Sequence, residues 1–420
     1  MDASQPTQNS RVETIAKCLV IAAAAIYLAA SALYMLKFAR VHFCDFQARY
    51  NEVHCVWTGL DPYDLYAGKK TSPVFYAWWG VVPDDPNARC VDFYPPWSYT
   101  YLAPLATLPY RAALGVFLGL NILAVLGIAA IGAGLGYHVR RSRLDAAFAA
   151  SAAVCLAKAL PLMLDAANYG LLIACAAIVM VLLLNRGRDV LAGLVWALMM
   201  VKIQTGPLFF IPLFIGRKYK TIAVAVLACA LAALPTALLL HKSPVDLVLC
   251  LASRGSDMIR CSVLAGALMP FFTNPQMTAV EALLGIGICS TASWLLRGQS
   301  DWLVKFVPPS IACVLWTYSQ CQDQIMFAIP QLCLALLILK EQAAWKKAAY
   351  AIGILCLWYT TYESVLDFFD RFFSWPPDTK HVFEQVRFVA GFIAALSWYG
   401  ISLALPLLIR KPAGESRSGT

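Results

Sequence analysis

Residues 186–220 read RGRDVLAGLVWALMMVKIQTGPLFFIPLFIGRKYK, and this stretch determines how the chain can meet a membrane. Arginine and lysine clusters lie at both of its ends, and the residues between them are mostly apolar. Two full crossings would need about 40 residues, and one crossing would put a basic cluster on the wrong side. Because polar residues, Gly206 and Pro207 interrupt the apolar run, we expect two half-helices, 190–201 and 207–216, that enter and leave from the cytoplasm.

The interruption carries a lysine, Lys202, inside an otherwise apolar run. Irregular backbone at membrane depth is tolerated only where it is buried in protein or lines a polar cavity. A charged side chain there costs at least about 2.5 to 3.5 kcal/mol, so it needs a counter-charge. A phosphate head group would supply one, and the alternatives are a buried carboxylate or a side chain that extends to the membrane surface.

The composition places the whole chain in lipid. Of its 420 residues, 60% are hydrophobic and 14% are charged, and a water-soluble domain cannot bury that much apolar surface. The first apolar run is too long for a signal-peptide core, so we interpret it as a retained anchor. Basic clusters mark the cytoplasmic side. We therefore expect an all-α, multi-pass protein of the cell membrane, a single domain over 1–420 with both termini cytoplasmic. The full spans expected, about ten by length, are 15–36, 111–137, 144–164, 169–185, 221–240, 277–296, 303–318, 325–340, 348–366 and 388–409.

Three longer loops are expected on the non-cytoplasmic face. Residues 37–110 form the largest, rich in Tyr, Trp, Pro and Asp, and 241–276 and 367–387 form the others. Apolar residues at helical spacing within 46–57 predict a helix that lies flat at the membrane interface. Any chemistry is expected to be performed by these loops.

Asp45 opens the first of these loops and puts an unpaired carboxylate at the membrane surface. Such a group can accept a proton from a substrate hydroxyl. The alternative is an N-cap for the helix that follows, a role that Asp performs well. Asp61 precedes Pro62 and is typical of a turn.

Other polar residues at the outer face have two open readings each. Asn168 and Tyr169 belong to a tight turn between spans, where capping the next helix and binding a sugar are both open. Arg254 and Arg260 either bind an anionic group or form a solvated face. The five histidines are scattered, so no metal site and no cofactor is expected.

Several function classes are excluded by pattern. The chain has no P-loop, no GxGxxG and no HExxH, which argues against nucleotide-driven transport and zinc proteolysis. The net charge of +9 comes from short clusters between apolar runs and forms no continuous basic face, so no nucleic-acid partner is expected.

Several motifs, in order, resemble a known family. These are Asp45-Phe46 with Tyr50, then Gly59-Leu60-Asp61-Pro62-Tyr63, then Phe93-Tyr94-Pro95-Pro96 leading to Ala103-Pro104-Leu105, then Asn168-Tyr169-Gly170, and finally Ala192-Gly193-Leu194 through Lys202 to Pro207. Together they look like glycosyltransferase family 87, GT-C-fold enzymes that take their sugar from a polyprenyl phosphate. Two departures stand in this sequence: the turn at Asn168 lacks the family's Gln, and Lys202 is not closely followed by Pro.

The resemblance implies a mechanism and a set of roles. Asp45 would be the base of an inverting transfer, of mannose first and arabinofuranose second, from the polyprenyl-phosphate donor to a glycolipid or glycan acceptor. Lys202, Arg254 and Arg260 would hold the donor phosphate. The residues implied in substrate binding are Tyr50, Asp61, Tyr63, Tyr94, Asn168 and Tyr169. A lipid transporter or flippase is the alternative class, but transporters usually show matching broken segments in two halves, and only one is found here.

Overall fold

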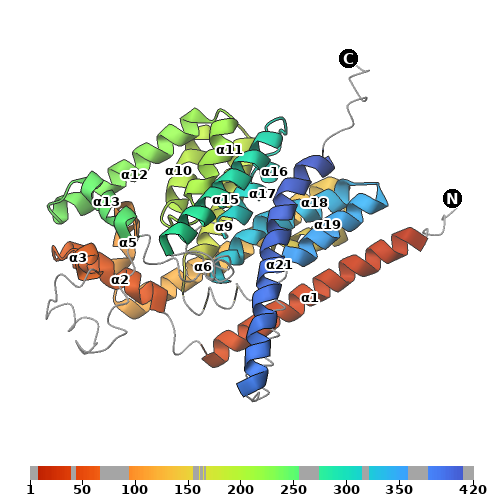
Figure 1. Ribbon diagram of the computed structural model, residues 1–420, viewed down its shortest axis with the longest axis horizontal. Coiled ribbons are helices and arrows are strands. Elements are labelled where there is room, and N and C mark those ends of the chain that lie inside the picture. Colours follow the sequence, from red (N-terminus) through yellow and green to blue (C-terminus); the bar gives the residue numbers. More distant parts are fainter. Residues whose placement is uncertain are drawn as a thin grey trace.

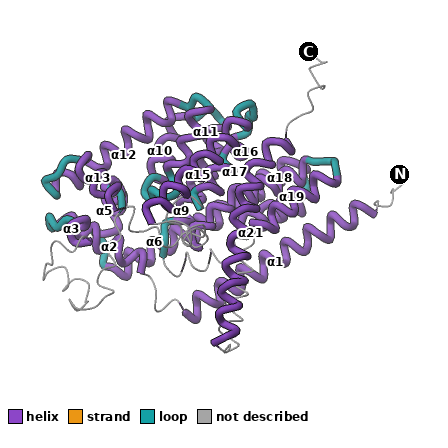
Figure 2. Tube along the Cα trace, in the orientation of Figure 1, coloured by secondary structure: helices purple, strands orange, loops and turns teal. Residues whose placement is uncertain are grey.

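A computed structural model gives the structure of the protein. It describes residues 8–38, 44–66, 94–154, 160, 164, 167–254, 274–314, 321–357 and 377–409. Every regular element within these ranges is helical, as expected from the composition, and Figure 2 shows short loops between the helices.

The first half of the chain begins with one long helix and a group of short ones. In order, the elements are α1 (Gln8–Phe38), α2 (Cys44–Trp57), α3 (Pro62–Tyr66), α5 (Pro96–Ala106), α6 (Tyr110–Arg140), α7 (Arg143–Val154) and α9 (Gly170–Asn185).

The second half continues with the interrupted segment and further long helices. In order, these are α10 (Asp189–Met199), the 3-10 turn η2 (Pro207–Phe209), α11 (Phe210–Ile215), α12 (Tyr219–Leu239), α13 (Pro244–Arg254), α15 (Asn274–Leu295), α16 (Trp302–Lys305), α17 (Val307–Ala312), the 3-10 helix η4 (Cys321–Phe327), α18 (Ala328–Lys340), α19 (Ala344–Leu357) and α21 (Pro377–Ile409).

Four described helical segments are long and apolar enough to cross a membrane: Arg11–Leu33, Tyr110–Arg140, Tyr219–Leu239 and Asp323–Lys340. These support a membrane protein, whereas the larger number of spans inferred from hydropathy stays a prediction. One expected span, 303–318, is not a single helix in its described part. It is divided into α16 and α17 at Phe306, two residues before Pro308 and Pro309, which lack the N–H groups that a continuous helix needs.

The interrupted segment folds back on itself. α10 ends at Met199, the next seven residues form turns, and η2 and α11 follow. Lys218, beyond α11, donates a hydrogen bond to the Asp189 carboxylate at the start of α10, with 2.8 Å between Nζ and Oδ1. The two ends of the hairpin therefore lie together, and its turn points into the molecule.

The two ends of the molecule differ in character. At one end, Glu13 of α1 accepts hydrogen bonds from Arg140 of α6 and from Lys347 of α19, at 2.6 and 2.9 Å. At the other end, Figure 1 shows α2, α3, α5 and α13 gathered together. The basic clusters around Arg140 and Lys347, both predicted to be cytoplasmic, thus share one end, and much of the expected first outer loop lies at the opposite one.

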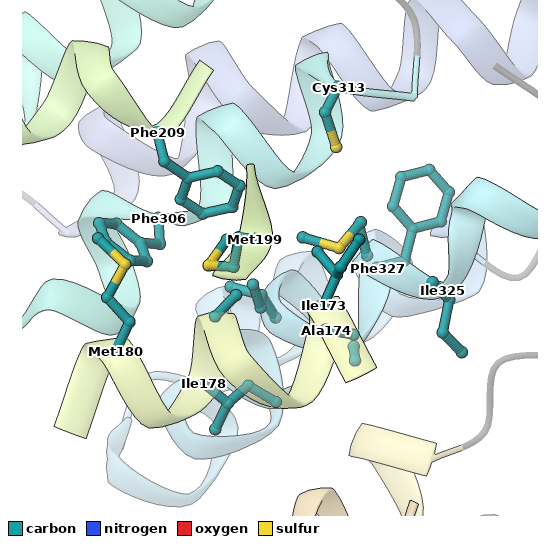
Figure 3. Close-up of a cluster of buried hydrophobic side chains, with 14 of the residues drawn as sticks. Ile173, Ala174, Ile178, Met180, Met199, Phe209, Phe306, Cys313, Ile325 and Phe327 are labelled. Carbon is teal, nitrogen blue, oxygen red and sulfur yellow. The ribbon is translucent and has the colours of Figure 1, made fainter. Parts of the chain in front are cut away.

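A tightly packed core surrounds the turn of the hairpin. Figure 3 shows its side chains from α9, from Met199 at the end of α10, from Phe209 of η2, and from Phe306, Cys313 and Phe327 of the later segments. Each of these named residues is at most 1% exposed. Burial of this kind holds the irregular backbone of the hairpin in one conformation and positions the polar groups next to it.

Candidate functional site

A chain of hydrogen bonds runs from α2 into the interior of the molecule. Asp45, in the first turn of α2, is half-buried, and its Oδ2 accepts a hydrogen bond from Nδ2 of Asn168 at 2.6 Å. The expectation of an unpaired carboxylate is therefore wrong, because α9 brings its preceding turn up to the start of α2. A residue 123 positions away in sequence supplies this partner.

Asn168 joins Asp45 to Lys202. Its Oδ1 accepts from the Gly170 backbone N–H at 2.9 Å, the turn geometry that Asn favours, and from Nζ of Lys202 at 3.3 Å. The side-chain amide thus accepts on one side and donates to Asp45 on the other. Asn168 is 3% exposed, so these hydrogen bonds are shielded from water.

Lys202 finds its counter-charge inside the protein. Its ammonium forms an ion pair with the carboxylate of Asp323 in η4, and the side chains of both residues are 3% exposed. Of the alternatives that the sequence left open, the buried carboxylate is the one observed. Asp45, Lys202 and Asp323 together carry a formal charge of −1.

Two tryptophans stabilise the irregular backbone around Lys202. Trp97 Nε1 donates to the carbonyl of Met200 at 3.0 Å, and Trp196 Nε1 donates to that of Gly206 at 2.9 Å. These indoles satisfy carbonyls that a continuous helix would have paired. At Gly206 a Cβ would lie 2.9 Å from the Met199 carbonyl oxygen, so only glycine fits without displacing the turn.

Aromatic rings lie beside the hydrogen-bonded chain. The ring of Tyr169 contacts those of Tyr94 and Phe117, with centroids 5.8 and 5.1 Å apart. The guanidinium of Arg49 lies 3.8 Å from the ring centroid of Tyr94 and pairs with Glu52 of the same helix at 2.7 Å. Arg49 and Glu52 are buried and of opposite charge, so they add no net charge to the site.

Asp61 and Tyr63 belong to a second cluster. Asp61 accepts from the Tyr63 backbone N–H at 2.8 Å, as expected of a turn residue, and its carboxylate pairs with Lys242 beyond the end of α12. Burial alone would lower the pKa of Lys242, but the carboxylates of Asp61 and Asp64 outweigh it and raise that pKa. Tyr63 connects the two clusters, because its hydroxyl donates to the Tyr94 carbonyl at 2.5 Å.

Of the remaining expected site residues, Tyr50 makes a separate contact, and the side chains of Arg254 and Arg260 lie outside the described residues. Tyr50 donates its hydroxyl to the carbonyl of Leu108 at 2.7 Å, which ties α2 to the end of α5. Arg254 ends α13, but its side chain lies outside the described part, as does all of Arg260. In the described residues, no group of three His, Cys, Asp or Glu side chains is placed to hold a metal ion.

An apolar groove adjoins the turn of the hairpin. It encloses about 410 Å³ between α5, α10, α12 and α13. Trp97, Trp196 and Met200 line its inner wall, and Ala230 and Val248 are among the residues of the other helices that line it. The same two indoles that bind the backbone around Lys202 therefore form one side of the groove.

Asp323 is the residue that the sequence interpretation missed. A signal was present in the sequence. Asp323 lies at the start of an apolar run, where burying its charge is as costly as burying that of Lys202, and charged groups inside a membrane protein pair with each other. Nothing in the sequence selected this carboxylate from the others, because 121 positions separate the partners.

A comparison with models of protein families identifies the family of this chain. The model of glycosyltransferase family 87 matches residues 93–339, more than half of the chain. This match confirms the resemblance seen in the motifs. A search of curated proteins and a search of solved structures each found no match.

Proposed function

Because the chain belongs to glycosyltransferase family 87, and is therefore a glycosyltransferase, we propose that it transfers a sugar from a polyprenyl phosphate to a hydroxyl of a lipid or glycan acceptor. The transfer takes place on the non-cytoplasmic face with Asp45 as the base. Mannose is the first choice of sugar and arabinofuranose the second.

One observation carries this proposal: the hydrogen-bonded chain from Asp45 through Asn168 and Lys202 to Asp323. It brings the half-buried carboxylate of Asp45 in α2 into one network with Lys202, a lysine buried in the interrupted segment. A carboxylate held in this way by an amide N–H has a fixed direction, which a general base requires. The arrangement suits a base that is already oriented before the acceptor hydroxyl binds.

The proposed step needs no further reactant. The acceptor oxygen attacks the anomeric carbon of the donor sugar, and the bond from that carbon to the phosphate oxygen breaks. The polyprenyl phosphate leaves with the bonding electrons, and Asp45 takes the proton of the hydroxyl. Attack opposite to the leaving phosphate inverts the anomeric centre. Since phosphate is a good leaving group, the protein contributes mainly by positioning and by stabilising negative charge.

The apolar groove supports a lipid-linked donor. A groove of about 410 Å³ lined by apolar side chains is of a size and character that suit part of a prenyl chain. Trp97, Trp196 and Met200 line it, and Met200 is two residues before Lys202 in the sequence. A prenyl chain in this groove would bring its phosphate towards the turn of the hairpin.

The donor phosphate needs more positive charge than the described site provides. A lysine ammonium has three N–H donors. Those of Lys202 bind Asp323 and Asn168, and one remains for a phosphate oxygen. Because Asp45, Lys202 and Asp323 sum to −1, we propose that Arg254 and Arg260, in the segment after α12, supply the balancing charges.

Transfer of radiolabelled sugar tests the proposal. Vesicles that contain the full chain are given polyprenyl-phosphate mannose, or polyprenyl-phosphate arabinofuranose, together with membrane acceptors, and Asp45→Asn is compared at equal abundance. Loss of transfer is expected for Asp45→Asn and not for Asp246→Asn, which changes an exposed carboxylate on α13. Unchanged transfer in Asp45→Asn removes Asp45 from the chemistry. No transfer from either donor by the unaltered chain favours a lipid transporter instead.

A further inference from the structure

The proposed base is oriented by a residue that it does not touch. Asp45 binds the NH₂ group of Asn168, and this contact depends on which way the amide of Asn168 points. An amide can turn over and exchange its oxygen and nitrogen. In that turned state, an oxygen lone pair would face the carboxylate and the hydrogen bond to Asp45 would be lost.

Lys202 prevents the turned state. An ammonium only donates hydrogen bonds, so it can face the oxygen of Asn168 but never its NH₂ group. The observed Nζ to Oδ1 distance of 3.3 Å has this arrangement, and the Gly170 backbone N–H, a second donor at 2.9 Å, enforces the same orientation. Both donors together leave only the NH₂ group to face Asp45.

Asp323 in turn holds Lys202 in place. Both side chains are 3% exposed, so the ammonium has little water to replace a lost partner. Without the carboxylate, the ammonium of Lys202 would move towards another acceptor. The amide of Asn168 would then keep only the Gly170 N–H to hold it turned towards Asp45.

We infer that Asp323 is a positioning residue for sugar transfer, acting through Lys202 and Asn168 to aim the carboxylate of Asp45 at the acceptor hydroxyl. The inference rests on the proposed function, in which Asp45 is the base. Asp323 itself touches neither the sugar nor the acceptor. Its contribution therefore affects kcat, whereas the donor KM is set by the groove and by the phosphate contacts.

Kinetics of the purified full chain in lipid vesicles test this, with polyprenyl-phosphate mannose, or polyprenyl-phosphate arabinofuranose where the unaltered chain prefers it. Asp323→Asn and Asn168→Ala should each lower kcat about 10- to 100-fold, the size of effect that a misplaced reacting group produces. The donor KM should stay within about twofold or fall, because Lys202 becomes less neutralised for a phosphate. The double variant should be no slower than the slower single variant, because both changes break the same chain.

The matched control is Asp145→Asn. Asp145 pairs with Lys17 at 2.5 Å, and the two side chains are 5% and 9% exposed. The substitution therefore breaks a similarly buried lysine–aspartate pair away from Asp45. At equal amounts of folded protein its kcat should equal that of the unaltered chain. A loss of kcat in this control as large as that in Asp323→Asn would assign the effect to structure alone and overturn the inference.

Several results would overturn the inference. Losses that multiply in the double variant would mean that Asp323 acts independently of Asn168. A higher donor KM at unchanged kcat in Asp323→Asn would assign it to donor binding. Should Asp323→Asn not fold, Asn168→Ala decides, because it leaves the pair of Lys202 and Asp323 intact, and normal kcat in that variant refutes the inference. If Asp45→Asn loses transfer but the kcat losses of Asp323→Asn and Asn168→Ala multiply in the double variant, only this inference is refuted. Normal transfer in Asp45→Asn refutes the proposed function.

Discussion

Breaking the ion pair of Lys202 and Asp323 should destabilise the protein more than removing it altogether. The perturbations are Lys202→Met, Asp323→Leu and the variant that combines them. Each single substitution leaves one buried charge without its partner, whereas the combined variant leaves two apolar side chains of suitable size. The comparison measures how strongly the surroundings of the pair exclude water.

The expected magnitude follows from burial. Both side chains are 3% exposed, so a lone charge at either position has almost no solvent contact. Removing one partner of such a pair costs about 3 to 5 kcal/mol, whereas replacing both by apolar residues is often neutral. The coupling energy of the cycle should therefore be at least about 3 kcal/mol.

Unfolding of the purified chain in mixed micelles by added SDS, followed by tryptophan fluorescence, provides the free energies. The control cycle uses Lys218 and Asp189, which pair at 2.8 Å with side chains 22% and 26% exposed. Water screens that pair, so its coupling should be about 0 to 1 kcal/mol.

A coupling energy below about 1 kcal/mol for Lys202 and Asp323 would refute the reasoning. If the single substitutions are then both mild, water reaches the pair. If both are severe and their costs add in the combined variant, each side chain has a separate structural role.

Three further predictions address the groove, the outer helices and the hairpin. Ala230→Trp fills part of the apolar groove and should raise the donor KM about tenfold, because two CH₂ groups of the donor lose their burial at about 0.8 kcal/mol each. Ala223 is exposed on the same helix outside the groove, so Ala223→Trp should leave the donor KM unchanged. Burial lowers the pKa of His54 from 6.5, so the folded state binds its proton less readily than the unfolded state, and the melting temperature should fall as the pH drops below about 6.5; a fall just as steep in His54→Gln would contradict this origin. A Cβ at Gly193 would lie 2.6 Å from the backbone oxygen of Thr221, so Gly193→Ala should cost about 1 to 3 kcal/mol in unfolding experiments, and an unchanged stability would mean that α10 and α12 separate easily.

The helices around the hairpin could be anticipated from local pattern. Apolar runs bounded by basic clusters predicted half-helices at 190–201 and 207–216, and the structure has α10 and then η2 with α11 on the two sides of the break. Hydrogen bonds within a helix connect residues close in sequence, so composition, proline and glycine are sufficient to locate its ends. The same local rules account for the break at Phe306 within the expected span 303–318, because Pro308 and Pro309 cannot donate the hydrogen bonds of a continuous helix.

The sequence by itself determined that this chain is an all-helical membrane protein of a glycosyltransferase family and that Lys202 needs a counter-charge. Only the tertiary structure decided which groups meet: Asn168 with Asp45, Asp323 with Lys202, and Lys242 with Asp61, pairs separated by 123, 121 and 181 positions. The physical reason is that a buried polar group requires a hydrogen-bond or ion-pair partner, but this requirement does not determine which residue becomes the partner. The choice of partner depends on how whole helices pack, and that packing is set by contacts along their entire length.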